Sequence, residues 1–167
     1  EACRVSEQAG WKHFFCGGRP GVADELAACL KRRFPRLNVV GTYTPPFRPL
    51  DETEKAELSS LVGQARPDIV WVGLSTPKQE AFMAEYLPIL DTTLMVGVGA
   101  AFDLLSGRVK QAPRWIQQSG LEWFYRTLQE PRRLSRRYFK HNPRFLGHVF
   151  LQLTHLRSYP LRKTDPR

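Results

Sequence analysis

The chain has 167 residues, enough for one domain with a core or for a domain with an appendage, and no apolar run approaches the length of a transmembrane helix. Its three cysteines, Cys3, Cys16 and Cys29, have neither zinc-site spacing nor the even number of a disulfide framework. The net charge of +9 is uneven, because residues 108–167 carry 14 Lys/Arg against 3 Asp/Glu, which indicates a nucleic acid, anionic lipid or diphosphate partner, or only a solubilising helical face.

The first elements alternate between strand and helix. Residues 1–9, followed by Gly10, resemble the end of a helix with a glycine cap, which suggests that the chain begins after earlier elements of a sheet. A short apolar run at residues 11–16 predicts a strand, and the glycine-rich residues 17–21 predict a turn. Apolar residues at helical spacing then predict a helix over residues 22–34. Cys16 and Cys29 are expected in the core of these elements.

The alternation continues to about residue 107. Strands are predicted at residues 37–40, 69–74 and 94–98, and helices follow Asp51 and Thr76, with Thr76 as N-cap and Pro77 in the first helical position, to about Leu87. Continuous apolar strands between helices are typical of a parallel sheet covered on both faces. We therefore predict an α/β fold with a doubly wound, mostly parallel sheet over residues 1–107.

Strand patterns are missing from the remainder of the chain. Helices are predicted at residues 115–118, 121–130, 132–139 and 144–156, and they form a basic helical appendage over residues 108–157 with a tail at 158–167. Basic residues after Pro131 form two neighbouring rows suited to phosphate groups. The apolar face of the last helix favours either a membrane interface or packing against the domain.

Three segments at predicted strand ends are candidates for ligand binding. The backbone around Gly17 and Gly18 would cradle a phosphate or form only a tight turn. Gln79 lies in the first turn of a helix after a buried strand, where open α/β sheets bind ligands, although a structural role is equally compatible with its position. Gly97 and Gly99 would let a ligand approach closely. Asp103 would accept hydrogen bonds from a sugar hydroxyl, or else cap a helix. The four histidines do not cluster, and no metal site is predicted.

Ordered motifs along the chain resemble those of the WecG/TagA/CpsF family of bacterial glycosyltransferases. They span roughly residues 8–146 and comprise Gly17-Gly-x-Pro-Gly21, Pro77-Lys-Gln-Glu80, Gly97-Val-Gly-x-x-Phe-Asp103, Gly107-x-Val-x-x-Ala-Pro113, Gly120-Leu-Glu-Trp123 and Arg126-x-x-x-Glu-Pro-x-Arg133-Leu, with Arg136-Arg137-Tyr138 behind. The resemblance implies transfer of a sugar, commonly N-acetylmannosamine or its uronic acid, from a UDP-sugar to a polyprenyl-diphosphate-linked acceptor. Products of the family feed wall teichoic acid, enterobacterial common antigen, capsule or exopolysaccharide.

The resemblance also implies roles for individual residues. Gln79 and Asp103 match donor-pocket residues, and Arg126, Arg133 and Arg136 match appendage residues that reach the lipid diphosphate. The implied reaction is inverting and uses no metal or other cofactor, so cationic side chains would stabilise the leaving UDP. The implied location is cytoplasmic, peripheral to the inner face of the plasma membrane, and a homo-oligomer is possible.

The sequence departs from the family pattern in two respects. Ser75 stands where members usually have glycine. The family's Thr-x-Asn segment and its Asp-Gly motif with the proposed catalytic base are missing, so the catalytic residue is not assigned and we expect these 167 residues to bind substrate without transferring sugar.

Two other classes of function remain alternatives. Basic helices with nearby aromatic residues would suit a nucleic-acid-binding module, but Leu121, Phe124, Tyr125 and Leu128 follow a core-facing helical period, which predicts buried rings and makes nucleic acid the weaker interpretation. The third class is a subunit that only docks at the membrane.

Overall fold

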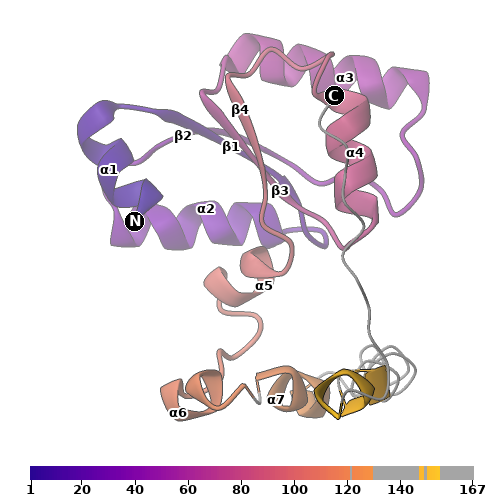
Figure 1. Ribbon diagram of the computed structural model, residues 1–167. Helices are drawn as coiled ribbons and strands as arrows, with labels where there is room; N and C mark the ends of the chain where they lie inside the picture. The colour runs from indigo at the N-terminus through magenta and orange to yellow at the C-terminus, as the bar shows by residue number, and fades with distance from the viewer. Residues whose placement is uncertain (121, 130–146, 149, 155–167) are drawn as a thin grey trace, which may run out of the picture. The chain divides into compact units, whose positions relative to one another are not determined.

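A computed structural model describes residues 1–120, 122–129, 147–148 and 150–154 of the chain (Figure 1). The chain divides into two compact units, residues 1–110 and residues 111–167. The first unit contains a four-stranded sheet and five helices. In chain order these elements are α1 (Ala2–Ala9), β1 (Lys12–Gly17), α2 (Val22–Arg33), β2 (Asn38–Tyr43), α3 (Glu52–Ala65), β3 (Ile69–Gly73), α4 (Lys78–Tyr86), β4 (Leu94–Gly97) and α5 (Ala101–Leu105).

The sheet is parallel throughout and has the strand order β2-β1-β3-β4. Figure 1 shows α2 and α5 on one face of the sheet and α3 and α4 on the other. Side chains from successive residues of β1 alternate between the two faces, so that Phe14 packs with α3 and α4 whereas Phe15 packs with α2 and α5. The predicted doubly wound α/β fold is therefore confirmed.

The two central strands are buried because helices cover both of their faces. Cys16 is completely buried, as predicted, and burial raises the pKa of its thiol to about 12. Cys29 is only half-buried, so the prediction that it belongs to the core was wrong. It lies at the margin of the apolar stripe of α2, whose buried residues are Val22, Ala23, Leu26, Ala27 and Leu30.

The ends of the helices follow local chemistry. Helix α1 ends at Gly10 in the left-handed conformation, as predicted from the sequence. Helix α4, however, begins at Lys78, and the Thr76–Pro77 peptide bond is cis. The prediction of Thr76 as N-cap was therefore wrong, and its hydroxyl instead donates to Glu80 Oε1 at 3.0 Å.

A polar pair lies within the apolar layer at the start of β1. His13 has no exposed surface, and its Nδ1 accepts a hydrogen bond of 2.8 Å from Trp71 Nε1. The planes of the His13 ring and the Trp71 indole are nearly parallel, at 4°, with 6.0 Å between centroids. Burial lowers the pKa of His13 below its ordinary value of 6.5, while the charge of Asp68 acts in the opposite direction.

Acidification should therefore destabilise the fold through His13. Because the folded state resists protonation of this ring, the unfolded state binds more protons below pH 6.5 and stability falls as the pH drops toward the lowered pKa of His13. One such group contributes at most about 1.4 kcal/mol per pH unit. His13→Gln, which keeps an acceptor for Trp71 without a titrating group, should reduce the loss measured by urea unfolding at pH 7.5 and 5.5. An equal loss in the variant would assign the effect to other groups.

The second unit begins with two short helices, α6 (Arg114–Gln118) and α7 (Glu122–Gln129), and residues 147–148 and 150–153 are also helical. Phe124 and Leu128 are 49% and 65% exposed, so the prediction that these two side chains are buried was wrong, whereas Tyr125 on the same face is half-buried. Helical spacing predicts an apolar face but not what covers it. Leu121 and the predicted helix at 132–139 lie outside the described residues. Among the described residues, no helix is both long and apolar enough to cross a bilayer.

Candidate active site at the carboxyl edge of the sheet

The carboxyl ends of all four strands meet at one edge of the sheet, because the strands are parallel. After β1 the chain turns to α2 on one face, and after β3 it turns to α4 on the other. Since β1 and β3 are neighbours, the two connections diverge between them. Open α/β sheets bind ligands at such a divergence.

Glycine lines this divergence because there is no room for side chains. The Gly18 N–H donates to Gly73 O at 2.9 Å. A Cβ at Gly17, whose φ is 132°, would lie 2.6 Å from the same carbonyl oxygen. A Cβ at Gly73 would lie 2.5 Å from the ring of Phe102, a residue of α5. The turn thus brings two backbone segments into direct contact, and the Gly18 N–H is already used within the chain. These contacts show that Gly17 and Gly18 form a tight turn against Gly73.

Gln79 connects helix α4 to the end of β4. Its Oε1 accepts a hydrogen bond of 2.8 Å from the N–H of Gly99. A Cβ at Gly97 would clash with the Gln79 amide, whose Cδ would lie 2.8 Å away. The side chain therefore holds the turn after β4 in place. Three of the candidate ligand-binding residues are thus in contact with one another: Gln79, Gly97 and Gly99.

Asp103 lies just beyond this turn, in the first turn of α5. It is not the N-cap, which is Ala100, so the helix-cap alternative was wrong. Its backbone carbonyl accepts from Val109 N at 3.0 Å and from Ser106 Oγ at 3.2 Å. Its carboxylate oxygen Oδ1 is buried, yet has no hydrogen-bond donor within the part of the chain that the structure describes. A buried carboxylate oxygen without a donor is costly for a protein to keep unless it serves a ligand.

The sequence matches the profile of the Glycosyl transferase WecG/TagA/CpsF family over residues 1–159. This chain belongs to the WecG/TagA/CpsF family. Membership makes it a glycosyltransferase of cell-surface polysaccharide synthesis, and it confirms the resemblance found from the motifs. The match extends beyond the residues 8–146 over which the motifs were recognised.

One WecG/TagA/CpsF motif contributes a contact that sequence reasoning missed. Arg108, within Gly107-x-Val-x-x-Ala-Pro113, pairs with Glu25 through two guanidinium nitrogens, Nε and Nη2, with Nη2 2.6 Å from Glu25 Oε1. The pair lowers the pKa of Glu25 and raises that of Arg108, in each case chiefly by the hydrogen bond between them. It ties the segment after α5 to helix α2. The sequence offered only one sign of this contact, an arginine at an unspecified position of the motif.

The basic residues that WecG/TagA/CpsF membership would place at the acceptor are only partly described. Arg126 belongs to α7, but its side chain lies outside the described residues, as do Arg133 and Arg136 entirely. No group of three or more His, Cys, Asp or Glu that would hold a metal ion is gathered within the described ranges.

Proposed function

We propose that the carboxyl edge of the sheet binds a UDP-sugar, and that the sugar is transferred to a polyprenyl-diphosphate-linked acceptor in cell-surface polysaccharide synthesis. The observation that carries this proposal is the buried Oδ1 of Asp103, which has no donor among the described residues and lies in the first turn of the helix that follows β4. A sugar or ribose hydroxyl supplies the missing donor. N-acetylmannosamine or a related sugar is the proposed group transferred.

The residues around Asp103 divide into contact and positioning roles. Asp103 is the proposed donor-binding residue, since its Oδ1 accepts no hydrogen bond from the described residues. Gln79 is a positioning residue as well as a candidate contact, because its Oε1 is already engaged by Gly99. Gly97 leaves room for the side chains of Gln79 and Met83, and both Gly97 and Gly99 are proposed to border the donor. Gly17 and Gly18 are proposed to pass beneath the diphosphate at the divergence of β1 and β3.

The proposed reaction is inverting and needs no bound metal. In the acceptor half, Arg126, Arg133 and Arg136 are proposed to face the diphosphates, where guanidinium groups bind oxygens bidentately and stabilise the charge on departing UDP. Attraction of the basic second unit to anionic lipids would keep the enzyme on the cytoplasmic face of the bacterial plasma membrane. We also propose that a homo-oligomer forms.

Selectivity among nucleotides tests this function. The chain should be stabilised against heat by millimolar UDP, and less by ADP or GDP, because binding to the folded state alone raises the midpoint of unfolding. A scan with each nucleotide, at one salt concentration and without added metal, measures the shift. Equal shifts with all three would indicate diphosphate binding without recognition of the base. Salt-sensitive binding of an oligonucleotide, with no response to UDP, would support the nucleic-acid alternative instead.

A further inference from the structure

The loop between β2 and α3 presents an aromatic ring to solvent at the carboxyl edge of the sheet. Phe47 is 77% exposed, more than any other large apolar side chain in the described part of the chain. Leu50, three residues later, is buried at 8% exposure. The loop is therefore anchored in the core at one point while Phe47 points away from it.

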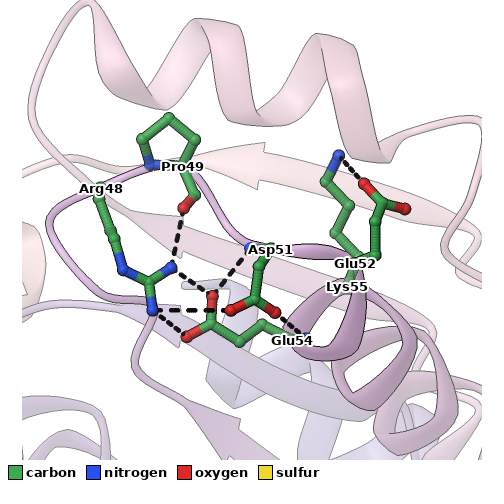
Figure 2. Close-up of polar contacts among 6 residues, drawn as sticks. All are labelled: Arg48, Pro49, Asp51, Glu52, Glu54 and Lys55. Atoms are coloured by element: carbon green, nitrogen blue, oxygen red, sulfur yellow. Dashed lines mark hydrogen bonds and ion pairs between the residues drawn. The ribbon is translucent and has the colours of Figure 1, made fainter.

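Polar contacts tie the loop beside Phe47 to the start of α3. Figure 2 shows Arg48 Nη1 and Nη2 on the two carboxylate oxygens of Glu54, at 2.6 and 2.7 Å. Glu54 also takes part in the capping box that begins α3, where its Oε2 accepts from Asp51 N at 2.9 Å. Three prolines within residues 44–50 further restrict the backbone. A preformed loop loses little conformational entropy when a ligand binds to it.

Lys78 joins this loop to the candidate active site. Its Nζ donates to the carbonyl oxygen of Phe47 at 2.9 Å and lies 5.6 Å from the centroid of the ring. Lys78 directly precedes Gln79, which holds Gly99 at the end of β4. An unbroken series of contacts therefore runs from Phe47 to the turn that precedes Asp103.

We propose that Phe47 is the platform on which the uracil ring of the donor stacks. This inference rests on the proposed function. An aromatic ring that is exposed, yet held in a fixed loop, suits a flat base, because each base offers a π-face to an aromatic side chain. The placement also agrees with doubly wound folds, where the nucleoside lies near the end of the second strand and the diphosphate near the first.

Titration of the chain with UDP tests this role. Phe47→Ala should weaken UDP binding about tenfold or more, whereas Phe47→Trp should stay near the wild-type affinity, because base stacking on an aromatic ring contributes on this scale. Leu87→Ala is the matched control, since Leu87 is 58% exposed and lies at the other end of α4. Inorganic diphosphate, which has no base, should bind wild type and Phe47→Ala with the same dissociation constant, obtained from its competition with UDP in each protein.

The outcomes separate this inference from the proposed function. Wild-type UDP affinity in Phe47→Ala would overturn the stacking role and leave the donor site standing. No UDP binding to the wild-type chain would overturn both. Loss of binding to vesicles with anionic lipid, with UDP affinity unchanged, would assign Phe47 to a membrane contact and overturn the inference.

Discussion

Gly17→Ala should lower the free energy of unfolding by about 3 kcal/mol, because the new methyl group would meet backbone rather than a movable side chain. The Cβ would lie 2.6 Å from the carbonyl oxygen of Gly73 and 2.9 Å from its nitrogen. The φ angle of Gly17, 132°, is also one that residues with a side chain rarely adopt. The clash could be relieved only if β3 moved away from β1, and Phe102, which packs against Gly73, opposes that movement. Urea unfolding followed by far-UV circular dichroism gives the change.

Gly63→Ala is the control for this substitution. Gly63 lies inside α3, and a Cβ there would meet nothing within 4 Å. Alanine is favoured over glycine in a helix, so this variant should gain about 0.5–1 kcal/mol. If Gly17→Ala were as stable as wild type, the contact between the ends of β1 and β3 would not be as close as described. The candidate site would then lack the tight turn proposed to lie under the diphosphate.

Asp103→Ala should leave the ligand-free chain as stable as wild type, or more stable by about 1 kcal/mol. The substitution removes a buried oxygen that has no donor in the described part of the chain, and burying such an oxygen costs about 1–3 kcal/mol. Against this gain stands the loss of a negative charge in the first turn of a helix, about 0.3–1 kcal/mol. Residues kept for a ligand commonly show this pattern, in which the fold improves when function is removed. Urea unfolding without nucleotide measures the effect.

Asp24 provides the comparison for Asp103. It also lies in the first turn of a helix, but its Oδ1 accepts a hydrogen bond of 2.6 Å from Thr42 Oγ1. Asp24→Ala should therefore lose about 1 kcal/mol. A loss in Asp103→Ala as large as that in Asp24→Ala would mean that Asp103 has a partner within the chain and is not held ready for a ligand.

Local patterns were sufficient to predict the fold. The unbroken apolar run at residues 69–74 indicated a strand buried on both faces, and the glycine turn after β1 indicated the connection to α2. These features depend on neighbouring residues. The start of α4 was misplaced because Pro77 was expected inside the helix, whereas it precedes Lys78 after a cis peptide bond.

The site could be predicted only in part, because its contacts join residues that are far apart in the sequence. Gln79 and Gly99 are 20 residues apart, and Arg108 and Glu25 are 83 apart, so neither pair leaves a local pattern. The prediction placed Gln79 and Asp103 after the correct strands. It could not show that Gln79 accepts from the backbone of Gly99, or that Oδ1 of Asp103 has no donor among the residues the structure describes. The exposure of Phe47 was likewise invisible, since an aromatic residue between prolines is compatible with either burial or exposure.

The most direct measurement is a calorimetric titration of the wild-type chain and Asp103→Ala with UDP-N-acetylmannosamine. Asp91→Ala is the control, because Asp91 precedes β4 at the opposite edge of the sheet and is exposed. Saturable binding by wild type and Asp91→Ala, weakened at least tenfold in Asp103→Ala, is the result predicted for a donor site at the carboxyl edge. Equal affinity in all three proteins, or no binding by the wild type, would contradict it.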